Sequence, residues 1–315
     1  MSLRAKIAGL GASLPERKLT NFDLEKLVET SDEWIRTRTG IQERRIAEKE
    51  LNASDYGLVA AREALARAGA DPRELDLILV ATSTPDMAFP STACIIQQAL
   101  GASKAAAFDI AAACSGFVYA LTTGSQFIET GMYRNVLVIG VDLLTRLVDY
   151  RDRSTCILFG DGCGAALLQP TESDDGILAS YLCSDGTGAD LLYVSNQEDG
   201  EYIRMKGSEV FRFAVKAMGD AAELALSKAG LSPEDVHLFV PHQANVRIIE
   251  ASAKRFGWPM EKVVVNIDRY GNTSAASIPV ALYEAERAGR IHRGDNILLV
   301  AVGGGLTWGA SVIRW

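Results

Sequence analysis

The chain has 315 residues, 48% of them hydrophobic and 23% charged, which is typical of a globular protein and excludes the disordered and collagen-like classes. This length predicts two domains or one duplicated unit. A formal charge of −8 with no run of basic residues argues against a nucleic-acid surface, because phosphate binding needs clustered Lys and Arg.

The N-terminal segment does not resemble a secretory signal. Its apolar stretch 7–14 contains glycines and stops at Pro15, so the apolar core of a signal peptide is missing. We therefore expect a cytoplasmic protein with no membrane partner. The uncharged stretch 296–313 is long enough to span a membrane, but its glycines favour two strands around a turn. These glycines are Gly303, Gly304, Gly305 and Gly309.

The cysteines and histidines do not follow a disulfide or metal-site pattern. The five cysteines are an odd number and show no C-x-x-C spacing, which argues against a disulfide framework and a zinc site. We expect reduced thiols and no metal. The residues are Cys94, Cys114, Cys156, Cys163 and Cys183, with His237, His242 and His292 as the only imidazoles.

Two distant segments resemble each other at a constant offset of 161 residues, as between Ala60 and Ala221. Each copy is typical of an Ala-rich helix, a glycine cap, a proline turn and then a strand, at 77–80 in the first copy and 238–240 in the second. The matching positions are Ala60, Ala61, Ala64, Leu65, Ala68, Gly69, Pro72 and Leu77, and Ala221, Ala222, Ala225, Leu226, Ala229, Gly230, Pro233 and Leu238.

The same offset continues to the next pair of strands. It pairs 120–121 with 281–282, and then aligns the apolar strands 136–141 and 297–302, whose continuous apolar character is typical of burial on both faces. Short Ala-rich matches also arise by chance, but a constant offset over about eighty residues favours duplication. We predict an α/β fold of two halves, 1–170 and 171–315, packed about a pseudo-twofold axis.

Cys114 lies where we expect a buried strand to give way to a helix beginning near Ser115. Backbone N–H groups and the helix dipole would stabilise a thiolate there, and the small neighbours would let a carbonyl approach. The alternative is that Cys114 is only a small buried hydrophobic residue, which is the interpretation we favour for the other four cysteines.

His242 and Asn272 are expected at equivalent strand ends of the second copy. At the offset of 161 residues Asn272 matches Ala111, and Cys114 matches Ala275, so the two loops should be structural twins that meet across the pseudo-twofold axis. Alternatively, His242 is a buried core residue and Asn272 caps a turn. One shared site explains the equivalent positions better than separate structural roles.

This combination of side chains indicates the reaction. An Asn amide cannot take a proton, so His242 and Asn272 supply two hydrogen-bond donors for a developing oxyanion, and no carboxylate is evident to activate water. A cysteine that holds an acyl group beside donors that hold an enolate suits decarboxylative carbon–carbon bond formation. The backbone N–H groups of Cys114 and of the glycine run at Gly304 are candidates for the thioester oxyanion hole.

The sequence resembles β-ketoacyl-acyl-carrier-protein synthase III of the thiolase superfamily, essentially from end to end. The segments that carry the resemblance are 31–35, 37–41, 112–116, 159–162, 241–245, 271–277 and 303–305. The resemblance implies a five-layer αβαβα homodimer that condenses an acyl-CoA with malonyl-acyl-carrier protein, releasing CO2 and CoA, and so initiates type II fatty acid synthesis. It implies no cofactor, since acyl-CoA is a substrate.

The resemblance also implies roles for individual residues. Cys114 would be acylated, and His242 and Asn272 would stabilise the enolate. Phe89 would reach the acyl pocket of the partner subunit, although it could also belong to the core. The residues implied for CoA and pantetheine are Trp34, Arg38, Arg153, Asn245, Gly207 and Phe211, and those for an acidic carrier protein are Arg212, Lys216, Arg247, Lys254 and Arg255. A packed Trp and solvated basic side chains are the alternatives.

Other functions compete with this prediction. The order Cys, His, Asn also occurs in papain-like cysteine hydrolases, but their local cysteine motif is missing and a duplicated α/β chain is a different scaffold. A non-catalytic carrier-protein-binding subunit would normally lack Cys114. Relatives that transfer acyl groups to oxygen or nitrogen share the fold and the cysteine. Acetyl, branched and medium-chain starters all remain open.

Overall fold

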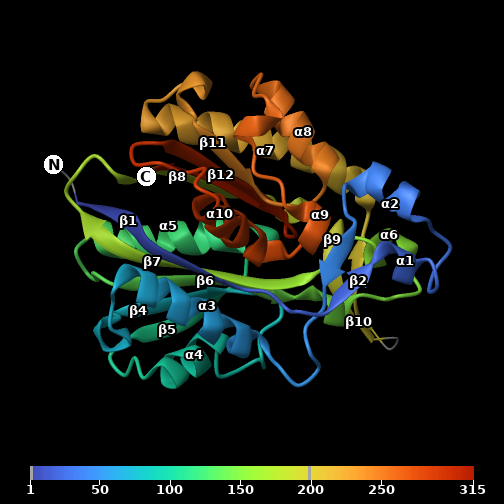
Figure 1. Ribbon diagram of the computed structural model, residues 1–315, viewed down its shortest axis with the longest axis horizontal. Helices are drawn as coiled ribbons and strands as arrows, with labels where there is room; N and C mark the ends of the chain where they lie inside the picture. The colour runs from blue at the N-terminus through green and yellow to red at the C-terminus, as the bar shows by residue number, and fades with distance from the viewer. Residues whose placement is uncertain (1–2, 198–199) are drawn as a thin grey trace.

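Two mixed β-sheets, one from each half of the chain, lie face to face with helices between them and on both outer faces (Figure 1). The computed structural model describes residues 3–197 and 200–315, and residues 1, 2, 198 and 199 lie outside this description. The first sheet has the order β1 (Arg4–Ser13), β7 (Asp161–Thr171), β6 (Val136–Leu143), β4 (Leu77–Ala81), β5 (Ala106–Ile110). The second has the order β8 (Gly176–Ser184), β13 (Thr307–Arg314), β12 (Asn296–Gly303), β11 (Leu238–Pro241).

Four strands of the first sheet repeat the topology of the second, and β5 is an additional strand parallel to β4. In the first, β4 is parallel to β6, and β7 is antiparallel to both β6 and β1. In the second, β11 is parallel to β12, and β13 is antiparallel to both β12 and β8. The chain passes from one sheet to the other between Thr171 and Gly176. The duplicated α/β fold expected from the constant offset is therefore confirmed.

Six helices build three layers around these sheets in the described part of the chain (Figure 1). α3 (Ala53–Ala68) and α4 (Thr92–Leu100) pack on the outer face of the first sheet, and α7 (Gly207–Ala229) and α8 (Val246–Arg255) on the outer face of the second. α5 (Gly116–Glu129) and α10 (Ser277–Arg287) lie between the sheets, where their apolar side chains meet both inner faces.

Small residues explain how closely the helices approach the sheets. The Ala-rich face of α3 buries Ala60 and Ala64 completely, and a Cβ on Gly11 of β1 would stand 2.1 Å from the carbonyl oxygen of Ala60. Both α3 and α7 end at a left-handed glycine, Gly69 (φ 63°) and Gly230 (φ 68°). Glycine adopts this conformation without the steric cost of a Cβ, so the predicted caps recur in both copies.

The remaining short elements cover one end of the layers, beside the candidate site (Figure 1). They bury an apolar cluster that includes Leu24, Ile35, Ile157 and Ile203. These elements are β2 (Lys18–Thr20), α1 (Asn21–Leu24), α2 (Asp32–Thr39), β3 (Glu43–Arg45), α6 (Arg153–Cys156), β9 (Leu192–Gln197), β10 (Gly200–Met205) and α9 (Ile267–Tyr270).

The strand before the nucleophile differs from the expectation. β5 is only partly buried, and Phe108 on it is 39% exposed, because β5 forms the open edge of the first sheet in the single chain. The stretch 296–313 forms β12 and β13 around a glycine turn, as predicted. Across residues 3–197 and 200–315, no helix has the length and apolar character that crossing a membrane requires.

Candidate active site

Two short 3₁₀ turns, one from each half of the chain, meet between the sheets. η2 (Ala113–Ser115) precedes α5, and η7 (Ser274–Ala276) precedes α10. Each turn packs against the sheet of the other half: a Cβ on Gly303 of β12 would stand 2.6 Å from the Cys114 nitrogen, and a Cβ on Gly140 of β6 would stand 2.3 Å from the Ala275 oxygen. The structure thus brings together the twin loops that the offset predicts.

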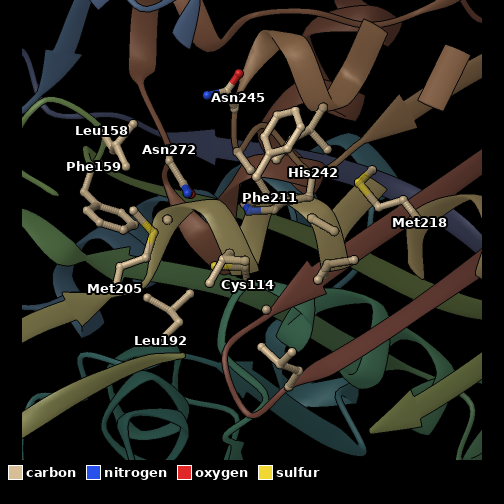
Figure 2. Close-up of a pocket in the computed structure, with 18 residues that line it drawn as sticks. Cys114, Leu158, Phe159, Leu192, Met205, Phe211, Met218, His242, Asn245 and Asn272 are labelled. Carbon is tan, nitrogen blue, oxygen red and sulfur yellow. The ribbon is translucent and has the colours of Figure 1, made fainter. Parts of the chain in front are cut away.

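Cys114, His242 and Asn272 line one cavity of about 100 Å³. Figure 2 shows their side chains around a shared space, with Cys114 from the first half and the other two from the second. Gly207, Phe211 and Asn245, which the resemblance assigns to the substrate, line the same cavity. The three side chains that we expect to share one substrate therefore line the same cavity.

The Cys114 thiol is buried and protonated at rest. Burial is the main cause that raises its pKa to about 12; a hydrogen bond from Ser274 Oγ at 3.3 Å opposes this effect, and the nearby Asp142 carboxylate adds to it. This differs from the thiolate expected at a helix N-terminus, because the loss of hydration outweighs the stabilising groups. Attack on a thioester must therefore coincide with removal of the thiol proton.

His242 is a neutral imidazole held at the end of β11. Its backbone N–H donates to the Val300 carbonyl at 2.7 Å, which extends the pairing of β11 with β12, and its Nδ1 lies 2.6 Å from Ser277 Oγ. Burial lowers the pKa of His242 to about 3. The ring is thus uncharged near neutral pH, and a hydroxyl proton given by Ser277 to Nδ1 leaves Nε2–H as a donor.

The Asn272 amide is fixed by its own turn. The backbone of Asn272 pairs with the segment around Phe159, donating to Leu158 at 2.8 Å and accepting from Gly160 at 3.0 Å. Its Oδ1 accepts the Ser274 N–H at 2.9 Å. Because the oxygen is engaged there, the Nδ2 donors face the cavity, where Figure 2 shows the amide nitrogen.

A buried carboxylate, Asp142, lies beside the nucleophile, contrary to the expectation that the site has none. It accepts hydrogen bonds from the Ser83 N–H at 2.6 Å and the Ala275 N–H at 3.1 Å, and burial raises its pKa to about 6. The chain separation hides this contact, since Asp142 and Ala275 are 133 residues apart. The sequence does contain one indication of this carboxylate: Asp142 is a charged residue near the end of the otherwise apolar strand β6.

A second pocket, open to the surface, adjoins the first. It has a volume of about 450 Å³ and shares Gly207, Phe211 and Asn245 with the cavity of Cys114. Its outer wall carries the basic side chains Arg38, Arg212 and Arg247. The basic side chains thus lie at the outer pocket, which we call the basic mouth, and the thiol lies in the adjoining inner one; this order suits a long arm attached to an anionic group.

The candidate nucleotide residues lie together at this mouth. The guanidinium groups of Arg153 and Arg38 lie 4.9 Å and 5.3 Å from the centroid of the Trp34 ring, so both cations contact the indole. The Asn245 amide donates to the Arg38 carbonyl at 3.1 Å and accepts from the Arg247 N–H at 2.9 Å. Asn245 thus caps α8 and joins it to α2.

An apolar cavity of about 220 Å³ adjoins the other side of Cys114. Gly304 lies in its wall beside Ala113, and Leu144, Val194 and Ile203 supply apolar surface. Phe89 is 85% exposed in the single chain and is not part of this wall. The cavity offers room for an acyl chain attached to the sulfur.

The candidate carrier-protein residues lie on the neighbouring helices α7 and α8. Arg212 and Lys216 belong to α7, and Arg247, Lys254 and Arg255 to α8. Arg255 forms ion pairs with Asp220 at 2.8 Å and Glu223 at 2.9 Å, which compensate its charge. In the described ranges, no group of three or more His, Cys, Asp or Glu side chains is arranged to hold a metal.

Comparisons with known proteins agree with this geometry. Residues 108–186 match the family model "3-Oxoacyl-[acyl-carrier-protein (ACP)] synthase III", and residues 226–315 match the model of its C-terminal part. The β-ketoacyl-[acyl-carrier-protein] synthase III of Caldanaerobacter subterraneus is 54% identical over 99% of this chain and 98% of its own. The crystal structure of the Aquifex aeolicus 3-oxoacyl-[acyl-carrier-protein] synthase III superposes with a TM-score of 0.96 at 54% identity, over 99% of this chain and all of that one.

A structure from specialised metabolism is also similar. The priming β-ketosynthase of the R1128 polyketide pathway has a TM-score of 0.94 at 38% identity, over 98% of this chain and 96% of its own. The fold, the site and these similarities define an acyl-transferring condensing enzyme with the thiolase fold. Within that class, the chain belongs to the β-ketoacyl-[acyl-carrier-protein] synthase III family.

Proposed function

We propose that the chain transfers the acyl group of an acyl-CoA to Cys114 and condenses it with malonyl-acyl-carrier protein, giving 3-oxoacyl-acyl-carrier protein, CoA and CO2. This is the initiating condensation of type II fatty acid synthesis. The observation that carries the proposal is the single cavity lined by Cys114, His242 and Asn272. The chemistry uses only these side chains and two thioester substrates, with no cofactor and no metal.

In the first half-reaction the pantetheine arm enters from the basic mouth. The Cys114 sulfur attacks the thioester carbon, the bond from that carbon to the CoA sulfur breaks, and the thiol proton ends on CoA. The backbone N–H groups of Cys114 and Gly304, which both line the apolar cavity, are the donors we propose for the oxyanion of the tetrahedral intermediate. The apolar cavity beyond Cys114 receives the acyl chain.

In the second half-reaction malonyl-acyl-carrier protein occupies the same path. Its carboxylate leaves as CO2, and the electron pair forms an enolate whose oxygen accepts hydrogen bonds from His242 Nε2–H and Asn272 Nδ2–H. The enolate carbon then attacks the acyl thioester on Cys114, the carbon–sulfur bond breaks, and the Cys114 thiolate takes up one proton from solvent, which restores the thiol. Neutral donors suit this step, because a cationic imidazolium would cost free energy in a buried site.

The open edge of the first sheet supports a homodimer. β5 has an unpaired edge, and exposed apolar side chains gather near it, with Phe108 39%, Met87 49% and Phe89 85% exposed in the single chain. Pairing two copies at this edge would cover them and place Phe89 at the partner's acyl cavity. Phe108→Glu should convert the dimer to a monomer in sedimentation velocity, whereas a monomeric wild-type protein would contradict the pairing.

The site of action follows from the substrates. We propose that the chain acts in the cytoplasm, where acyl-CoA and malonyl-acyl-carrier protein would have to be supplied together. The basic residues of α7 and α8 supply the patch that an acidic carrier protein needs on a protein of net negative charge.

One experiment tests the proposed function and compares starters. The purified protein is incubated with acetyl-, branched and medium-chain acyl-CoAs in separate reactions, and peptide mass spectrometry locates the adduct. We expect the acyl group on Cys114 and, after malonyl-acyl-carrier protein is added, a β-ketoacyl product two carbons longer than the starter. A Cys114→Ala variant that condenses at the wild-type rate would overturn the proposal, and release of free acid without malonyl-acyl-carrier protein would indicate a hydrolase.

A further inference from the structure

A fully buried arginine, which the steps above leave unused, lies behind the backbone of Asn272. Arg44 of β3 is 0% exposed, and burial lowers the pKa of its guanidinium to about 10, so the group is still a cation near neutral pH. In the described part of the chain its Nε has no hydrogen-bond partner. Burial of a charge costs free energy that an apolar side chain would not cost, which indicates a role beyond packing.

The Arg44 guanidinium joins three segments of the chain. Nη1 donates to the Leu19 carbonyl at 3.0 Å, Nη2 donates to the Ile157 carbonyl at 2.8 Å, and both donate to Asn21 Oδ1 at 3.0 Å. The Asn21 amide in turn donates to the Ile41 carbonyl at 2.7 Å. Because Asn21 is held through both its oxygen and its nitrogen, it fixes the orientation of the planar guanidinium.

The segment that Arg44 holds at Ile157 is the one that pairs with Asn272. The next carbonyl, of Leu158, accepts the Asn272 N–H at 2.8 Å, and the Gly160 N–H donates to the Asn272 carbonyl at 3.0 Å. The hydrogen bond from Nη2 therefore lies one residue away from the first hydrogen bond of this pair.

Arg44 also packs directly against both backbones of the pair. A Cβ on Gly160 would stand 3.0 Å from the Arg44 Cβ, and a Cβ on Gly271, the residue before Asn272, would stand 3.1 Å from it. Two glycines thus allow the arginine to approach the backbone on either side. A change at Arg44 must be felt by the turn that carries Asn272.

We propose that Arg44 is a positioning residue for the enolate step. It fixes the segment 157–160 and, through that segment, the backbone of Asn272, so that the Asn272 Nδ2 donor meets the enolate oxygen. In the described chain Arg44 lines neither cavity at Cys114, so it acts through Asn272 and not on the substrate. The inference rests on the condensation proposed above.

The other groups of the site have separate supports. His242 is held by its hydrogen bond to the Val300 carbonyl of β12, and the turn of Cys114 packs against Gly303 at the end of the same strand. Loss of Arg44 should therefore affect the Asn272 donor more than the nucleophile. The two half-reactions can distinguish these effects, because enolate formation needs this donor and acyl transfer does not.

The experiment measures the two half-reactions separately. Acylation of Cys114 by acyl-CoA is followed by mass spectrometry, and release of labelled CO2 from malonyl-acyl-carrier protein is followed in a single turnover of isolated acyl-enzyme. The variants are Arg44→Met, which is apolar and of similar length, and Arg44→Lys, which keeps the charge but not the planar fork. Arg290→Met is the matched control, because Arg290 also donates to backbone carbonyls, of Glu261 at 2.8 Å and Val263 at 3.1 Å.

We expect Arg44→Met to slow CO2 release at least about tenfold more than it slows acylation, because misplacing one oxyanion donor costs up to about 10²- to 10³-fold in rate. Acylation should slow only slightly, since Phe159 of the same segment lines the acyl cavity. Arg44→Lys should lie between the wild type and Arg44→Met. Arg290→Met should leave both rates unchanged.

An Asn272→Ala background separates positioning from general damage. If Arg44 acts through Asn272, adding Arg44→Met to Asn272→Ala should slow CO2 release by less than about threefold further, because the donor that Arg44 positions is already missing. Independent effects would instead multiply.

Equal slowing of both half-reactions by Arg44→Met, unchanged CO2 release, or multiplied effects in the double variant would overturn the positioning role. If Arg44→Met does not fold, judged by circular dichroism, Arg44→Lys is assessed by the same ratio of rates. Failure of both variants to fold would also overturn the proposal, since Arg44 would then serve the fold alone. A wild-type protein that forms no acyl-Cys114 would instead overturn the proposed function.

Discussion

Gly303 and Cys114 are packed so closely that no side chain fits between them. A Cβ on Gly303 would stand 2.6 Å from the Cys114 nitrogen and 3.0 Å from the Ser115 nitrogen. Gly303 ends β12 of the second sheet, whereas Cys114 belongs to a turn of the first half. The nucleophile is thus positioned by the sheet that also positions His242.

Gly303→Ala should displace this turn and separate the sulfur from its partners. We expect kcat/KM for acyl transfer to fall about 100-fold, because a displacement of about 1 Å in a positioned group has effects of this size. Gly186→Ala is the control, since a Cβ at Gly186 meets no atom within 4 Å. Equal rates of Cys114 acylation in the two variants would show that the close packing does not position the sulfur.

His242→Ala and Asn272→Ala should impair decarboxylation more than acylation. Each removes one donor to the enolate oxygen, and loss of such a donor typically costs about 10²- to 10³-fold in rate. Release of labelled CO2 from malonyl-acyl-carrier protein measures decarboxylation, and mass spectrometry of Cys114 measures acylation. A larger effect on acylation in both variants would favour a hydrolase-like role for these residues.

The buried neutral His242 predicts a loss of stability in acid. Its pKa is about 3 in the folded state, against about 6.5 when unfolded. The unfolded chain therefore takes up this proton first as the pH falls, and His242 should lower the free energy of unfolding by about 2 kcal/mol between pH 8 and pH 5.

Urea unfolding of the wild type and His242→Gln at both pH values isolates this contribution. The opposing effect of Asp142, whose raised pKa favours the folded state as pH falls, is present in both proteins. The variant should lose about 2 kcal/mol less than the wild type between pH 8 and pH 5. Equal losses would mean that His242 is protonated in the folded protein.

Trp34→Ala should weaken binding of the nucleotide end of acyl-CoA. The indole is flanked by Arg38 and Arg153, and stacking with a base is lost when the ring is removed. We expect KM for acyl-CoA to rise about tenfold with little change in kcat. An acyl N-acetylcysteamine thioester, which has no nucleotide, is the control substrate and should react equally well with both proteins.

Charge reversal on α7 and α8 should affect the carrier protein selectively. Lys216→Glu and Lys254→Glu are expected to raise KM for malonyl-acyl-carrier protein several-fold, more at low than at high salt, and to leave Cys114 acylation by acyl-CoA unchanged. Arg255→Glu should have a smaller effect, because Asp220 and Glu223 already compensate Arg255. Equal effects of all three reversals would argue against a localised patch.

The sequence predicts the fold well because duplication leaves a visible offset. Ala60 and Ala221 both lie in buried helix faces, and Gly69 and Gly230 both cap those helices, so local propensity and pattern agree in the two copies. The same pattern could not show that β5 has an unpaired edge. Its apolar residues match a buried strand in sequence, and only the strand order shows that it lies at an edge.

The sequence predicted which three side chains line the candidate site, but it did not predict the charges and pKa values there. The offset placed Cys114 beside the loop of Asn272, yet burial, which governs the pKa of Cys114, depends on packing from both halves. Asp142 and Ser274 were missed because their contacts join residues far apart in the chain. Long-range hydrogen bonds of this kind leave no periodic pattern in a sequence.

A single-turnover chase most directly tests whether one thioester on Cys114 is shared by side chains of both halves. Acyl-enzyme is isolated, mixed with malonyl-acyl-carrier protein, and quenched at intervals. We predict that the acyl group leaves Cys114 at the same rate as the 3-oxoacyl product and CO2 form. Product that accumulates while the acyl group remains on Cys114 would contradict it.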